Sequence, residues 1–217
     1  MSLSDQLIEI REATKQNVPA DTYAAMMKAT KDVIESKIAE KAPKVGQKLL
    51  NFNLPNALGE MRSLNQLLAN GPLVLTFYRG GWCPYCNLEL QAYQQVLGEI
   101  KAAGATLVAI TPELPDASLS TSEKNELAFE VLTDKNAAYA NQLGIVFTLA
   151  EELRPIYLNF GIDIEKHNGE KQFELPLAAT FIIDTDGTIS SAFVDADYTV
   201  RQEPSDVVET LNNHVVA

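Results

Sequence analysis

The chain has 217 residues, enough for a domain with its own hydrophobic core, so it does not need disulfide bonds in order to fold. Acidic residues outnumber lysines and arginines by 29 to 17, and the formal charge of −12 argues against nucleic-acid partners and anionic membranes. No stretch offers the ~20 apolar residues of a membrane-spanning helix, and charges interrupt the N-terminus too early for a signal peptide. We therefore expect a cytoplasmic protein, in a compartment where thiols stay reduced.

Two helices are predicted at the N-terminus. Ser4 is the expected N-cap of the first, and the second carries an apolar stripe at helical spacing over residues 23–38 until Pro43 ends it. The sequence thus predicts a helical extension at residues 1–44 and a second domain at residues 45–217. The stripe is expected to pack on its own chain or on a twin subunit, and we predict a homodimer.

The middle of the chain is predicted to form a β–α–β unit. Residues 73–78 and 106–110 are continuous apolar runs, typical of strands buried on both faces, and residues 84–103 form the helix between them. A crossover of this length joins parallel strands. Residues 129–132 predict one more short strand.

The C-terminal part is predicted to form a β-hairpin and a last helix. Residues 180–184 and 189–194 flank an Asp186-Gly187 turn, and the helix starts after Pro204. Residues 149–175 are an insertion whose secondary structure the pattern leaves open. A β–α–β unit followed by a hairpin and a terminal helix is the element order of a thioredoxin-like α/β fold.

Cys83 and Cys86 are the two cysteines of the chain, and they flank Pro84-Tyr85 where the first buried strand gives way to a helix. Their spacing on one helical turn places the Cα atoms ~5–6 Å apart, which suits a disulfide. Pro84 suits the first helical position, and the helix dipole and free N–H groups lower the pKa of a thiol at that point. Because the thiolate is the nucleophile in disulfide exchange and in attack on peroxides, the pair predicts a redox site.

Two other uses of the cysteines are open. A structural zinc site needs four cysteine or histidine ligands, whereas the chain adds only the isolated His167 and His214, so no metal and no cofactor are expected. Two inert core thiols are the second alternative, but Gly80-Gly81 and Trp82 make a poor core environment. His167 is predicted to be a solvated loop residue and His214 to lie on the surface of the last helix.

From Pro43 onward the chain resembles the alkyl hydroperoxide reductase/thiol-specific antioxidant family, the peroxiredoxins in the broad sense. The resemblance rests on the stretches Val45–Pro55, Phe77–Cys86, Val131–Asp134 and Ala179–Gly187. The segment Asp197–Pro204 is similar to a subgroup that carries the two-cysteine motif. The resemblance implies a peroxiredoxin-type, three-layer fold with a central mixed sheet.

The site departs from the family motif Pro-x-x-x-Thr-x-x-Cys. In this register the proline falls on Arg79, the threonine on Cys83 and the peroxide-reacting cysteine on Cys86. The family's peroxide-orienting arginine falls on Ala178, where thioredoxins place a cis-proline, and Pro176 lies two residues earlier.

The resemblance implies a thiol-dependent peroxidase. In this hypothesis Cys86 attacks hydrogen peroxide or an organic hydroperoxide, Cys83 condenses with the resulting sulfenic acid, and a thioredoxin-like or glutathione-type reductant opens the disulfide. Arg79 and Arg201 are the candidates to stabilise the departing oxyanion, and a surface salt bridge is the alternative for each.

Two other functions stay open. In a thiol–disulfide oxidoreductase of the thioredoxin or glutaredoxin type, Cys83 attacks a protein or glutathione disulfide and Cys86 resolves it. In a redox-sensing protein, the N-terminal helices bind a partner and the disulfide switches that contact.

Overall fold

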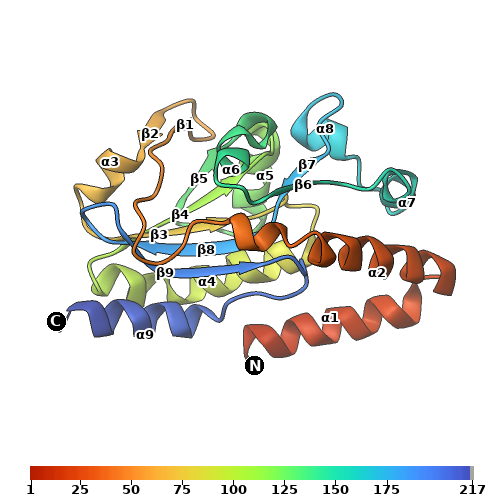
Figure 1. Ribbon diagram of the computed structural model, residues 1–217, viewed down its shortest axis with the longest axis horizontal. Helices are drawn as coiled ribbons and strands as arrows, with labels where there is room; N and C mark the ends of the chain where they lie inside the picture. The colour runs from red at the N-terminus through yellow and green to blue at the C-terminus, as the bar shows by residue number, and fades with distance from the viewer. Residues whose placement is uncertain (216–217) are drawn as a thin grey trace.

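The computed structural model describes residues 1–215, which form a five-stranded sheet with helices on both faces (Figure 1). The strands are β3 (Leu73–Phe77), β4 (Thr106–Thr111), β5 (Glu130–Thr133), β8 (Ala178–Ile183) and β9 (Ile189–Asp195). Their order is β5-β4-β3-β8-β9. The strands β3, β4 and β5 run parallel, while β8 is antiparallel to both β3 and β9. This mixed sheet confirms the predicted thioredoxin-like fold.

Two pairs of helices make the outer layers. One face carries α3 (Leu64–Leu68) and α6 (Ala138–Gln142), and the other carries α4 (Pro84–Ala102) and α9 (Pro204–Val215). Side chains alternate along β3, so Leu73 and Leu75 face the first pair and Val74 faces the second. Because both faces are covered, all five residues of β3 are buried, which explains its uninterrupted apolar sequence.

The predicted β–α–β unit and hairpin are both present. The helix α4 connects β3 to its parallel neighbour β4, and β8 pairs with β9 across the Asp184–Gly187 turn. Gly187 donates its N–H to the Asp184 carbonyl at 2.8 Å and has a φ of +86°, a conformation that favours glycine.

The N-terminal segment forms α1 (Leu3–Asn17), α2 (Ala20–Glu35) and the 3-10 helix η1 (Ile38–Lys41). The predicted cap at Ser4 is wrong, since Ser2 caps α1 in a reciprocal capping box with Asp5. The second helix ends earlier than predicted, because Lys37 adopts a left-handed φ of 56° and interrupts it before Pro43.

Both helices pack against the rest of the chain (Figure 1). Leu3 and Leu7 of α1 are buried in the cluster that also contains the two cysteines. The Glu203 carboxylate accepts hydrogen bonds from the backbone of Leu3 at 3.2 Å and of Ser4 at 2.6 Å. The buried residues of α2 contact the insertion, so the part of the apolar stripe around Met26 is covered by its own chain, whereas Ile34 is exposed.

The insertion at residues 149–175 is ordered. It holds α7 (Leu153–Asn159), α8 (Ile164–Asn168) and most of β7 (Glu174–Pro176), which pairs antiparallel with β6 (Val146–Thr148). The remaining elements are β1 (Asn53–Pro55), β2 (Met61–Ser63), α5 (Pro115–Lys124) and η2 (Lys135–Ala137). Within residues 1–215, no helix is both long and apolar enough to cross a membrane.

Candidate active site

The two cysteines lie where β3 gives way to α4, as the sequence predicts. Cys83 is the N-cap residue of α4, Pro84 takes its first position, and Cys86 lies in its first turn. Both are free thiols and both side chains are fully buried. The two sulfurs thus lie beyond the carboxyl end of a buried parallel strand, at the N-terminus of a helix. Backbone N–H groups favour a thiolate at such a position.

The loop before the cysteines is closely packed. A Cβ at Gly80 would lie 2.2 Å from Trp82 Nε1, and a Cβ at Gly81 would lie 2.0 Å from Thr121 Oγ1. Only glycine fits at these two positions. The Gly81 N–H also donates to the buried Glu113 carboxylate at 3.0 Å, which fixes the loop on the end of β4.

Cys83 faces a buried cation. Arg79 Nη2 lies 3.1 Å from Cys83 Sγ, and the Arg79 side chain is almost completely buried. Burial opposes ionisation of this thiol. The hydrogen bond from Cys86 and the charges of Arg79 and Arg201 outweigh that effect and hold the pKa of Cys83 well below its ordinary value. Cys83, with its sulfur 3.1 Å from Arg79, is therefore the more acidic thiol of the pair.

Cys86 faces a cation that also binds a buried carboxyl group. Arg201 Nη2 lies 3.4 Å from Cys86 Sγ, while Arg201 Nε donates to Glu89 Oε2 at 2.7 Å. Backbone carbonyls of Tyr198 and Val200 hold the same guanidinium. Burial, and then the hydrogen bond and charge of Cys83, raise the pKa of Cys86 well above its ordinary value. Cys86 is therefore the less acidic thiol of the pair.

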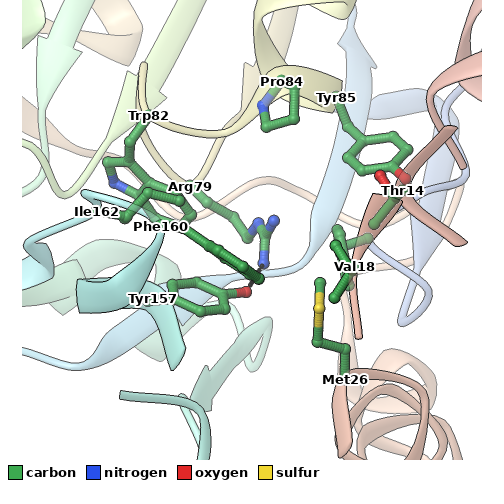
Figure 2. Close-up of a pocket in the computed structure, with 11 residues that line it drawn as sticks. Thr14, Val18, Met26, Arg79, Trp82, Pro84, Tyr85, Tyr157, Phe160 and Ile162 are labelled. Atoms are coloured by element: carbon green, nitrogen blue, oxygen red, sulfur yellow. Dashed lines mark hydrogen bonds between the residues drawn. The ribbon is translucent and has the colours of Figure 1, made fainter. Parts of the chain in front are cut away.

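A cavity of about 200 Å³ opens beside Arg79 (Figure 2). Its walls come from four parts of the chain, namely the N-terminal helices, the cysteine loop, the α7 segment and the loop between β9 and α9. They include Thr14, Val18, Met26, Arg79, Trp82, Pro84, Tyr85, Tyr157, Phe160, Ile162 and Tyr198. The guanidinium of Arg79 points into this space and lies over the Tyr198 ring at 4.0 Å and the Trp82 ring at 5.1 Å. A small apolar molecule in this cavity would contact Arg79, the arginine that holds Cys83 Sγ.

The structure brings all four predicted site residues together. The alternative of surface salt bridges for Arg79 and Arg201 is wrong, because both side chains are buried and each touches a cysteine sulfur. Ala178, which replaces the family's peroxide-orienting arginine, is a buried residue at the start of β8. Pro176 does not restore a cis-proline, because residues 1–215 contain no cis peptide bond.

Sequence reasoning missed two buried carboxylates of the site. Glu89 lies three residues after Cys86 on α4, and this helical spacing was the signal that could have revealed it. Desolvation raises the pKa of Glu89 to about 7. Glu113 had no such signal, because its partners come from distant segments. One of them is His167, which is not a solvated loop residue, since its Nδ1 lies 3.1 Å from Glu113 Oε1.

Two further expectations concern His214 and metal ligands. His214 lies in α9, and its side chain is outside the described residues. Among the side chains that the structure describes, residues 1–213, no three of histidine, cysteine, aspartate or glutamate are grouped as metal ligands.

A Cys-x-x-Cys pair at a helix start, after a buried parallel strand and on a sheet with a C-terminal hairpin, defines an oxidoreductase of the thioredoxin-fold superfamily. The sequence profile of the AhpC/TSA family matches residues 45–192, which is more than half of the chain. The chain belongs to this family, the peroxiredoxins.

Individual relatives agree with this assignment. The chain is 28% identical over 149 residues to a putative peroxiredoxin bcp of Coxiella burnetii, covering 69% of this chain and 87% of that protein. It is 26% identical over 152 residues to peroxiredoxin Bcp of Escherichia coli K12, covering 70% and 86%.

Solved structures show the same fold. The crystal structure of peroxidoxin BcpB from Mycobacterium tuberculosis superimposes with a TM-score of 0.61 at 23% identity, covering 78% of this chain and 97% of that one. Peroxiredoxin 6 of Arenicola marina gives a TM-score of 0.65 at 18% identity, covering 80% and 74%.

Proposed function

We propose that this protein is a thiol peroxidase that reduces hydrogen peroxide or organic hydroperoxides with the Cys83/Cys86 pair. The observation that carries the proposal is the 3.1 Å contact between Cys83 Sγ and Arg79, a buried arginine that lines a cavity. Relatives in the family are named peroxiredoxins, which agrees with this activity.

The chemistry needs both sulfurs. The Cys83 thiolate attacks one oxygen of the O–O bond and becomes a sulfenic acid, while the other oxygen leaves as an alcohol or water after taking a proton. The Cys86 thiol then attacks the oxidised sulfur, a disulfide forms, and a second water leaves. The Arg79 guanidinium stabilises the departing oxyanion, and Arg201 holds the second sulfur in place.

The order of attack differs from the sequence expectation. The family register predicts Cys86 as the nucleophile, whereas the electrostatics favour Cys83. Arg201 is paired with Glu89, and although its charge lowers the pKa of Cys86, burial and the neighbouring Cys83 sulfur outweigh that effect. Arg79 forms no ion pair with a carboxylate within residues 1–215, so its full charge acts on Cys83.

Two single variants test the order. After treatment with hydrogen peroxide, we expect Cys86→Ser to form one sulfenic acid per chain, detected as a dimedone adduct by mass spectrometry. Cys83→Ser should react no faster than an ordinary thiol. The opposite pattern would restore Cys86 as the nucleophile, and no adduct on either variant would contradict the peroxidase itself.

A disulfide oxidoreductase is the second candidate, and a specific observation favours it. An ionised first cysteine at the helix N-cap is the arrangement that attacks disulfides. Steady-state assays with equal concentrations of cumene hydroperoxide and of a protein–glutathione mixed disulfide separate the two. Faster turnover of the mixed disulfide would replace the peroxidase proposal.

Three further proposals concern the reductant, the cell compartment and the oligomeric state. A buried pair that cycles through a disulfide needs an external dithiol, so we infer a thioredoxin-type or glutathione-type reductant. A reducing compartment such as the cytoplasm would keep that reductant available. The homodimer stays a prediction, which sedimentation velocity tests directly.

A further inference from the structure

The cavity beside Arg79 combines an apolar lining with one buried cation. Its walls are largely rings and aliphatic side chains, among them Val18, Tyr157 and Phe160. The guanidinium of Arg79 points toward its centre, close to the Tyr157 hydroxyl (Figure 2). A site of this composition favours a ligand with an apolar body and one anionic group.

Arg79 lacks a permanent counter-ion. Its side chain is 4% exposed, and no carboxylate within residues 1–215 forms a salt bridge with it. Its Nε atom has no hydrogen-bond partner there, and its contact with the Tyr157 hydroxyl is long at 3.5 Å. An unpaired buried charge costs several kcal/mol, so the Cys83 thiolate is the anion that makes Arg79 tolerable.

Oxidation removes that anion. When two electrons pass from the sulfurs to a hydroperoxide, the products are a disulfide, an alcohol and water, and neither sulfur then carries a charge. Arg79 is left as a buried cation at the edge of a cavity. Oxidation does not remove the partner of Arg201, because Arg201 still contacts Glu89 at 2.7 Å.

We propose that this cavity binds a small apolar monocarboxylate through Arg79, and that it does so more tightly in the disulfide form than in the dithiol form. A carboxylate is the anion that matches the planar donors of a guanidinium. The rings of Trp82, Tyr157 and Phe160 would contact a ring-sized body edge to face. Only the redox dependence rests on the proposed function; the carboxylate site itself rests on Arg79 and the cavity.

Isothermal titration calorimetry with benzoate tests the proposal on the intact protein. Protein oxidised with diamide should bind benzoate at least about tenfold more tightly than protein reduced with a phosphine. Benzamide, which has the same shape without the charge, should bind both forms weakly. Equal affinities of benzoate for the two forms, or equal binding of benzamide and benzoate to the oxidised form, would overturn it.

Two variant pairs assign the effect to the cavity and to the charge. Val18→Phe should fill the cavity and abolish benzoate binding, whereas Val45→Phe, the same change at an exposed position, should leave it unchanged. Reduced Cys83→Ser lacks the sulfur that faces Arg79 and should bind benzoate as tightly as the oxidised wild type. If Cys83→Ser binds like the reduced wild type, the charge argument is wrong. If hydroperoxide turnover fails while these affinities hold, the proposed function is lost and this site remains.

Discussion

The Glu113 carboxylate accepts the backbone N–H of Gly81 at 3.0 Å, which joins the segment after β4 to the loop that presents the cysteines. Tyr78, Thr121 and His167 place three more polar groups within 3.2 Å of the same carboxylate. One buried group thus holds the cysteine loop, α5 and the insertion together.

We expect Glu113→Gln to destabilise the protein and slow its chemistry. The amide would turn an NH2 group toward hydrogen-bond donors, which costs about 1–3 kcal/mol of unfolding free energy. Because the loop would shift, the rate of oxidation by hydrogen peroxide should fall about tenfold. Denaturant unfolding and stopped-flow fluorescence of Trp82 measure the two effects. Glu123→Gln on the exposed face of α5 is the control, and equal behaviour of the two variants would refute the role of Glu113.

Replacing Arg79 should raise the pKa of Cys83. In Arg79→Gln the thiol loses the cation 3.1 Å away, and its pKa should rise toward or above the ordinary value. Oxidation by peroxide at neutral pH should slow accordingly, since only the thiolate reacts. The ultraviolet absorbance of the thiolate, followed against pH, reports the shift. Arg62→Gln removes an arginine that pairs with Glu60 and Glu130 instead, and it should leave the titration unchanged.

Glu89 should make the folded protein less stable as pH rises. Burial raises its pKa from about 4.5 unfolded to about 7 folded, so the folded state favours the protonated form. The stabilising contribution is complete below pH 4.5 and is lost as pH rises toward 7, a change of order 3 kcal/mol.

The Glu89→Gln variant isolates this contribution. Denaturant unfolding of wild type and variant between pH 4.5 and 8 should show a difference in stability that grows with pH and levels off above 7. A constant difference over this range would mean that Glu89 is ionised throughout.

Leu7 should be a major anchor of the N-terminal helices. It is 5% exposed and packs in the cluster with the cysteines, so Leu7→Ala should lower the unfolding free energy by about 2–4 kcal/mol. Its neighbour Ile8 is 58% exposed, and Ile8→Ala should change stability by less than about 0.5 kcal/mol. Guanidinium unfolding of both variants gives the comparison. Similar small losses would show that α1 is docked only loosely.

Much of the fold follows from local sequence. Continuous apolar runs identify β3 and β4 because these strands are buried on both faces, and Asp-Gly identifies the hairpin because its turn needs a positive φ. The position of Cys83 and Cys86 at a helix start could likewise be predicted locally, because Pro84 is typical of the first helical position whatever the distant residues are. These features depend on neighbours in the chain.

The ionisation of the two cysteines depends on residues that are far apart in the sequence and meet only in the folded protein. The two arginines look equivalent in the sequence, yet only Arg201 has a carboxylate partner. That partner, Glu89, is 112 residues away in the chain. The cavity needs α1, α2 and α7, which meet only after the insertion has packed on the N-terminal helices. The sequence therefore determined that a redox pair exists at a helix start. Only the tertiary structure decided which sulfur is ionised, because long-range charge and burial set a pKa.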